Sequence, residues 1–191
     1  MKRSSFITLL LIWISTLIAA NTVQAQSKVG TSAVPFLGMS VSARATAMGT
    51  AFVGIADDAT SLYYNPGGIV NSGPVALSAS YTDWILDTQF NWVGFIYNFD
   101  GSNALGLSVT YLNYGEEEVT TVTSPEGTGE MWSAGDLALS LSYARTLTDK
   151  FSIGGSAKYI QSTIWNETAT SFAFDVGLLF TTPFDGMKLG M

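Results

Sequence analysis

Residues 136–146 read DLALSLSYART, and this stretch decides the fold. Large apolar residues alternate there with small ones: Leu137, Leu139, Leu141 and Tyr143 with Ala138, Ser140, Ser142 and Ala144. A period of two places each set on its own face of a β-strand. A soluble sandwich would cover its second face with charge. An uncharged face of small residues is typical of a barrel interior, so we predict a transmembrane β-strand whose apolar face meets lipid.

The same alternation recurs in five other segments after residue 74. They span residues 75–82, 89–99, 103–113, 150–162 and 170–181. Residues 188–191 look like the start of a seventh strand. Six strands cannot close a barrel, and an open edge in lipid leaves backbone groups unpaired. We therefore predict an all-β chain that is the N-terminal part of a larger antiparallel transmembrane β-barrel. A small self-associating barrel is the less favoured alternative.

The composition excludes several classes of function. Charged residues make up 12% of the 191 residues, and the net charge is −7. Nucleic acid as a partner is excluded because phosphate binding needs clustered Lys and Arg. Cysteine and histidine are both absent, which removes thiolate and imidazole metal ligands and any nucleophile activated by a histidine base. We expect no enzymatic activity, no cofactor and no metal.

The N-terminus has the pattern of a secretory signal peptide. Lys2 and Arg3 precede the largely apolar residues 6–19, and residues 23–25 read VQA, with small side chains at the cleavage positions. We predict a signal peptide over residues 1–25, a hatch over residues 26–74 and barrel strands over residues 75–191. The location expected is the outer membrane of a Gram-negative bacterium. An uncleaved N-terminal anchor is the alternative.

The lengths of the connections predict how the strands cross the membrane. Residues 100–102 and 147–149 resemble short periplasmic turns, and residues 182–187 return the chain on the same side. The longer links resemble extracellular loops: residues 83–88, 114–135 and 163–169. Aromatic residues at the strand ends predict girdles at the two interfaces, with Trp84, Trp132 and Trp165 outside and Phe99, Phe151 and Phe184 inside.

The second strand leaves its register open. Val93, Phe95, Tyr97 and Phe99 form its more apolar face, but Trp92 falls on the other face. The dipeptide Asp-Gly at residues 100–101 favours a two-residue turn. For the apolar faces of this strand and the next to lie on the same side of the sheet, however, the turn must have an odd number of residues or one strand must contain a bulge.

Residues 42–70 read SARATAMGTAFVGIADDATSLYYNPGGIV and match neither a signal nor a strand. Ser42 can cap a short helix through Met48 that Gly49 ends. Asp57 can cap a second helix over residues 58–64, which Asn-Pro at residues 65–66 must end. Helices this short need a surface to pack on, and we predict that they occupy the barrel lumen.

Two groups of charges are predicted to act inside the barrel. Arg44 with Asp57 and Asp58 is an ion-pair latch between hatch and wall, or else a set of ordinary caps beside a solvated arginine. Lys158 and Asp175 fall on the small-residue face. If the hairpin turns between residues 166 and 167, they lie directly opposite each other as a lumenal pair, mainly structural rather than substrate-guiding.

The link over residues 114–135 is acidic. Its five glutamates are Glu116, Glu117, Glu118, Glu126 and Glu130. Carboxylates can bind Ca²⁺, but the Asp-x-Asp spacing of a dedicated loop is missing. A solvated acidic loop is the favoured interpretation.

The motifs ARATAMG (43–49), ADDA (56–59) and YNPGG (64–68) resemble the N-terminal signature of the PorV/PorQ branch of FadL-type outer-membrane proteins. The hatch motif comprises Arg44, Met48, Gly49, Asp57, Asp58, Asn65, Pro66 and Gly67. Gly67 stands where the family usually has Ala. The resemblance implies a fourteen-stranded barrel with an N-terminal hatch.

The resemblance also implies partners. PorV-like members serve type IX secretion by receiving cargo proteins from the translocon, so we expect contact with outer-membrane lipid and with secretion machinery or cargo. The alternative is FadL-like passive transport of long-chain fatty acids or other hydrophobic molecules. Transport predicts a continuous apolar pocket between hatch and wall or a sideways opening to lipid. Partner binding predicts long, ordered extracellular loops without such a pocket. A soluble secreted β-sandwich is the third hypothesis.

Overall fold

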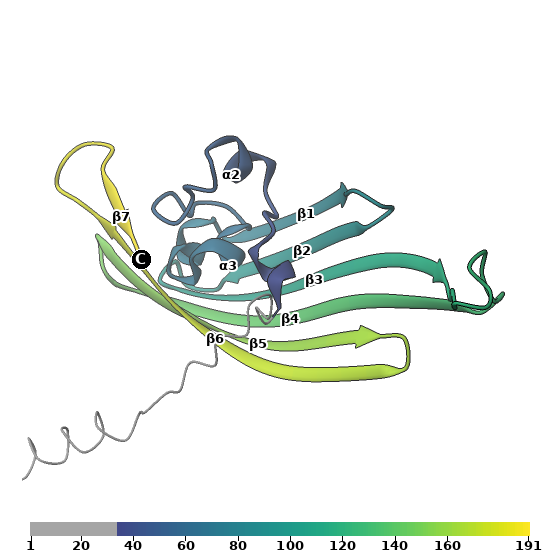
Figure 1. Cartoon of the computed structure of the whole chain (residues 1–191). Coiled ribbons are helices and arrows are strands. Elements are labelled where there is room, and N and C mark those ends of the chain that lie inside the picture. Colours follow the sequence, from purple (N-terminus) through teal and green to yellow (C-terminus); the bar gives the residue numbers. More distant parts are fainter. Residues whose placement is uncertain (1–33) are drawn as a thin grey trace, which may run out of the picture. The chain divides into compact units, whose positions relative to one another are not determined.

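The structure is a computed structural model that describes residues 34–191. Within these residues, each strand of one antiparallel sheet pairs with the next along the chain (Figure 1). The strands are β1 (Val75–Asp83), β2 (Gln89–Asn98), β3 (Asn103–Glu118), β4 (Met131–Thr148), β5 (Phe151–Ile164), β6 (Glu167–Thr181) and β7 (Lys188–Gly190). The sheet curls into a half-barrel, which confirms the predicted fold class. The predicted signal peptide lies outside the described residues.

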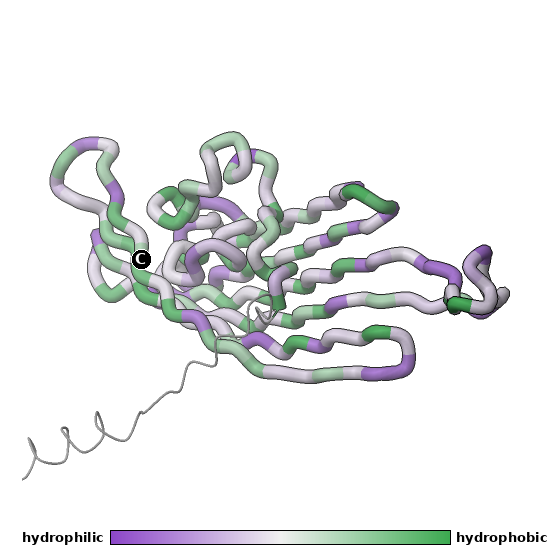
Figure 2. The backbone as a smooth tube through the Cα atoms, viewed as in Figure 1, coloured by the Kyte–Doolittle hydropathy of each residue, from purple (hydrophilic) through white to green (hydrophobic). Residues whose placement is uncertain are grey.

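The two faces of the sheet differ as the alternation predicted. The convex face carries exposed apolar side chains such as Leu107, Leu141 and Phe174, whose exposed fractions are 57%, 55% and 79%. The concave face carries buried small residues such as Ser142 and Ala144. Figure 2 shows the resulting alternation of hydrophobic and more polar residues along the strands.

Short helical segments lie on the concave face (Figure 1). They are η1 (Pro35–Gly38), α2 (Ala43–Ala47), α3 (Ser61–Tyr64) and η2 (Pro66–Asn71). None of the helices within residues 34–191 is long and apolar enough to cross a membrane. The side chain of Ser42 accepts a hydrogen bond from the amide of Ala45, and Gly49 has a φ of +64°, so the predicted first helix is confirmed.

The second predicted helix begins later than expected. Asp58 does not start it, because its carboxylate accepts hydrogen bonds from the amide and the hydroxyl of Thr60, at 2.8 and 2.6 Å. This local turn competes with a helical turn. Helix α3 therefore starts at Ser61, and Asn65 ends it as predicted. The 3₁₀-helix η2 follows directly, and the side chain of Asn65 caps it by accepting a hydrogen bond from the amide of Gly67.

Trp92 settles the register of β2. Its side chain is fully buried on the concave face, in the apolar core shared by sheet and helices. Phe99 pairs with Asn103 across a three-residue turn in which Gly101 has a φ of +75°. Asp100 accepts hydrogen bonds from the amides of Ser102 and Asn103, which lowers its pKa. The turn thus has the odd length that the phases required.

Two predicted loops are shorter than expected. β3 and β4 extend into residues 114–135 and leave only residues 119–130 between them, because an irregularity between Asn113 and Glu116 lets the ladder continue. β5 and β6 are joined by Trp165 and Asn166 alone, since cross-strand pairing continues up to Ile164 and Glu167. Trp132 shares the phase of the buried Ala138 and so belongs to the concave face, not to the outward girdle.

Candidate functional site: a hatch seated on glycines of the sheet

The described part of the hatch, residues 34–74, packs on the concave face through one apolar core. Phe36, Leu62 and Ile69 of the hatch are buried in this core together with Trp92 and Ile160 of the sheet. A Cβ atom on Gly106 would collide with Leu62, and one on Gly94 would collide with the ring of Trp92 and lie 3.0 Å from Leu62. The sheet therefore makes room for α3 by leaving out side chains.

Asn65 ties the hatch to β6. Its side-chain amide nitrogen donates to the carbonyl of Leu178 on β6, at 2.9 Å, and to that of Val53 in the hatch, at 2.8 Å. Its oxygen accepts from the amide of Gly67 at 3.0 Å. Ser152 of β5 donates to the carbonyl of Gly67 at 2.6 Å. Buried polar groups are costly unless paired, so these bonds fix the position of the motif on the sheet.

Two wall glycines form the seat of the motif. Gly154 of β5 and Gly177 of β6 lie directly opposite each other. A Cβ atom on Gly154 would collide with the carbonyl of Pro66, and one on Gly177 would lie 2.8 Å from the Pro66 ring. A Cβ on Gly67 would lie 2.6 Å from the carbonyl oxygen of Gly177. An alanine at residue 67 would therefore require the wall to move, which explains why a glycine suits this position.

Two tyrosines of α3 hold the start of the hatch. The Tyr63 hydroxyl lies 2.5 Å from the carbonyl oxygen of Leu37 and 2.6 Å from that of Met39. The Tyr64 hydroxyl is hydrogen-bonded to the hydroxyl of Ser40 at 2.7 Å. Burial raises the pKa of Tyr63. This role could not be predicted from the sequence, because nothing in the spacing pairs these tyrosines with residues more than twenty positions away.

Arg44 forms its ion pairs within the hatch. Its guanidinium lies 2.7 Å from Asp57 and 3.2 Å from Asp58, and it also lies over the ring of Phe52. The hydrogen bond from Arg44 and its positive charge lower the pKa of Asp57, and the hydrogen bond to Asp57 and its negative charge raise the pKa of Arg44. The predicted latch between hatch and wall is therefore wrong, because α2 and the loop before α3 bring these partners together on the exposed side. Met48, which ends α2, is also exposed.

Lys158 and Asp175 pair diagonally across β5 and β6. The Lys158 nitrogen lies 2.6 Å from an oxygen of Asp175, yet Lys158 is opposite Ala173 in the register. The predicted direct opposition is wrong because the turn centres one residue earlier, between Trp165 and Asn166. That difference moves each partner by two residues and so preserves the faces. Lys158 also lies 5.9 Å from the ring centre of Tyr63, so this pair contacts the hatch.

The acidic link is an ordered hairpin tip. The carboxylate of Glu118 accepts a hydrogen bond from the amide of Gly129 at 2.6 Å, and the amide of Val119 donates to the carbonyl of Glu130 at 2.8 Å. Within residues 34–191, no group of three or more acidic side chains is arranged to hold a metal ion.

Comparison with known protein families matches residues 22–180 to the family described as type IX secretion system protein PorV. The match extends from before the hatch into β6, and so includes the seat formed by Gly154 and Gly177. A comparison with curated proteins found no match. The resemblance first noted in the hatch motif is confirmed, and the chain belongs to the PorV family of type IX secretion system proteins.

Proposed function

We propose that this chain is a non-enzymatic outer-membrane component of type IX secretion that binds secretion machinery or cargo through the β3–β4 hairpin. The observation that carries the proposal is the length of this hairpin. β3 and β4 still pair at Glu118 and Met131, whereas the pairing of β4 with β5 ends at Ala134. The hairpin therefore projects beyond its neighbours on the side predicted to be extracellular (Figure 1).

The charge of the hairpin supports a basic partner surface. Residues 114–135 contain five glutamates and no Lys or Arg. Complementary charge speeds encounter and selects among partners more than it adds affinity. The backbone bonds within the tip hold the loop itself in one conformation, which reduces the backbone entropy lost on binding.

Hydrophobic transport remains a second proposal, and a cavity favours it. A cavity of about 920 Å³ lies between residues 38–47 of the hatch and the strands β1 and β2. Met39, Val41 and Phe90 contribute apolar surface to it, and Ser42 and Thr46 contribute hydroxyls. A cavity at this place is the feature that FadL-like transport predicts, whereas the partner-binding hypothesis predicts long loops without such a cavity.

Neutralising the hairpin tests the first proposal. Replacing Glu116, Glu117, Glu126 and Glu130 by Gln removes charge but retains Glu118, which holds the loop. We expect severalfold less cargo at the cell surface when this variant replaces the wild type, because the basic partner loses its attraction. The matched control is Glu167→Gln, which neutralises an exposed glutamate in the neighbouring hairpin.

Normal cargo secretion by the quadruple variant would contradict the proposal. The second proposal has its own test in Ala47→Phe, which narrows the cavity without touching the hairpin. Lower uptake of labelled long-chain fatty acid with normal cargo secretion would favour transport.

A further inference from the structure

We propose that the convex face of β3–β5 binds one lipid with an uncharged, hydroxyl-rich sugar headgroup. Two neighbouring depressions in this face carry the inference: a polar notch toward the hairpin tips and an apolar hollow beside it. The proposal goes beyond cargo binding. It rests on the proposed outer-membrane setting, in which the convex face meets lipid.

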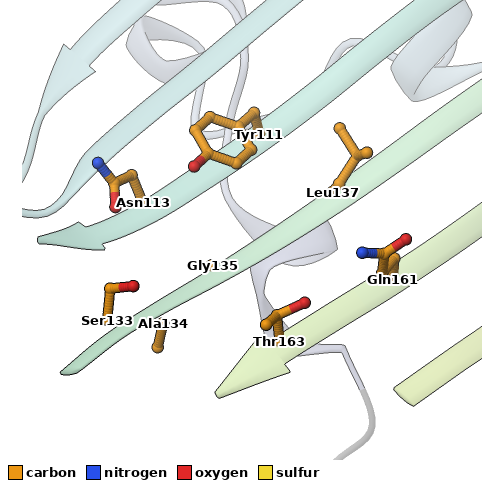
Figure 3. Close-up of a pocket in the computed structure, with 8 residues that line it drawn as sticks. All are labelled: Tyr111, Asn113, Ser133, Ala134, Gly135, Leu137, Gln161 and Thr163. Atoms are coloured by element: carbon orange, nitrogen blue, oxygen red, sulfur yellow. The ribbon is translucent and has the colours of Figure 1, made fainter. Parts of the chain in front are cut away.

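The notch has a volume of about 230 Å³ and exists because one residue lacks a side chain. Gly135 lies opposite both Asn113 of β3 and Thr163 of β5. Figure 3 shows side chains from β3 and β5 on either side of this glycine. The polar lining consists of Tyr111, Asn113, Ser133, Gln161 and Thr163.

The notch lies at the border of the apolar band. Tyr111, Leu137 and Gln161 form one row across the three strands. The next row on the convex face, one step closer to the predicted periplasmic turns, is apolar and consists of Val109, Leu139 and Tyr159. In a membrane barrel, this border between apolar and polar rows is the level of the lipid headgroups.

The chemistry of the notch selects a neutral headgroup. Apart from Ala134 and Leu137, its lining side chains are amides, hydroxyls and a phenol, which can both donate and accept hydrogen bonds, as sugar hydroxyls do. None of its lining residues is Lys or Arg, the residues that bind phosphate. Glu116, opposite Ser133 in the register, adds a negative charge that disfavours anionic headgroups.

The hollow offers room for an acyl chain. It has a volume of about 420 Å³ and is lined by apolar side chains that include Leu107, Leu141 and Phe172. Its floor is Ala157, a small residue between Leu141 and Phe174 in the register. Notch and hollow occupy successive rows of the same strands, so together they match a molecule with a polar head and an apolar tail. A protein partner would not need this pairing.

The experiment uses the full chain in nanodiscs of phosphatidylethanolamine that also contain glucosyl diacylglycerol and phosphatidylglycerol. Native mass spectrometry after release from the nanodisc measures which lipid stays bound. We expect the sugar lipid to be retained in preference to both others. Gly135→Leu fills the notch without a backbone collision, since its Cβ lies 3.4 Å from the nearest atom. Loss of one or two hydrogen bonds should reduce retention about five- to tenfold.

Controls separate a site from ordinary lipid contact. Ala157→Phe fills the hollow and should also reduce retention, whereas Leu77→Phe, on the convex face of β1, should leave it unchanged. Gln161→Ala provides a smaller change should Gly135→Leu fail to fold, and it should also weaken retention. Equal retention of phosphatidylglycerol, or full retention by both notch variants, would overturn the lipid site alone. Failure of the wild-type chain to enter nanodiscs would overturn the outer-membrane setting as well.

Discussion

Gly154→Val is expected to release the hatch from the sheet. The new side chain would occupy the position of the Pro66 carbonyl and the Gly67 amide, and these are backbone atoms that cannot rotate away. Overpacking of a close-packed interior costs about 1–3 kcal/mol, and a collision with backbone belongs at the upper end of that range. We expect the free energy of unfolding to fall by about 3 kcal/mol.

The measurement combines urea unfolding in detergent, followed by tryptophan fluorescence to which the buried Trp92 contributes, with trypsin cleavage after Arg44 in the hatch. Gly155→Val is the matched control. It changes the next residue of the same strand, on the convex face, where a Cβ meets only the carbonyl of Asp175 at 3.4 Å. Equal stability and equal cleavage of the two variants would show that the hatch does not sit on Gly154.

Asn65→Ala is expected to have the second largest effect. Asn65 is only 1% exposed, and the substitution removes the two hydrogen bonds that its side chain donates and the one that it accepts. The carbonyl of Leu178 keeps the amide of Met191 as a partner, whereas that of Val53 loses the bond from Asn65. Leaving a buried group unsatisfied costs about 1–3 kcal/mol, so we expect a loss of about 2–3 kcal/mol in the free energy of unfolding.

Asn65→Asp refines this test. It keeps the oxygen that accepts from Gly67 but replaces the donor with a second oxygen facing two carbonyl oxygens. We expect it to destabilise at least as much as Asn65→Ala at neutral pH, because a buried charge is left without a partner. Asn71→Ala, at an exposed position of the same hatch, is the control. A tolerated aspartate would mean that the amide nitrogen makes no essential bond.

The strands and their faces could be predicted from the sequence because alternation responds directly to burial. Residues 136–146 show the reason. Alternate residues face lipid and the barrel interior, which favour different side chains, so each pair of neighbouring residues indicates which one faces which side. Trp92 breaks the pattern of small residues on the concave face because it packs against the hatch, which the alternation alone does not reveal. A large ring on the concave face is buried once helices pack against it.

Exact pairing could not be predicted, since turns depend on local geometry. The β5–β6 turn centres one residue earlier than its sequence indicated, and Trp165 accepts a positive φ of 55° there. Lys158 and Asp175 still meet, because a two-residue displacement keeps both on the concave face. The position of the Arg44 ion pairs could not be predicted, because it depends on how the hatch folds on itself and not on the alternation within the strands.

Only the hatch side of the contact between hatch and sheet could be recognised in the sequence. Asn65, Pro66 and Gly67 stood out as a motif, but the wall that receives them did not. The available signal was the occurrence of Gly154 and Gly177 on the small-residue faces of neighbouring strands. In the observed register Gly154 and Gly177 form a cross-strand pair. Paired glycines in a sheet often mark a place where another backbone segment approaches closely.

The central claim is that the convex face meets lipid while the concave face holds the hatch. Spin-label accessibility tests it, and the absence of native cysteine makes each introduced label unique. Labels at Leu107 and Phe174, on the convex face, should collide often with oxygen and rarely with a water-soluble nickel chelate. Labels at Ser171 and Ala173, on the concave phase of β6, should show less contact with oxygen. Nickel contact at Leu107 and Phe174 as frequent as on the concave face would contradict the account and favour a soluble sandwich.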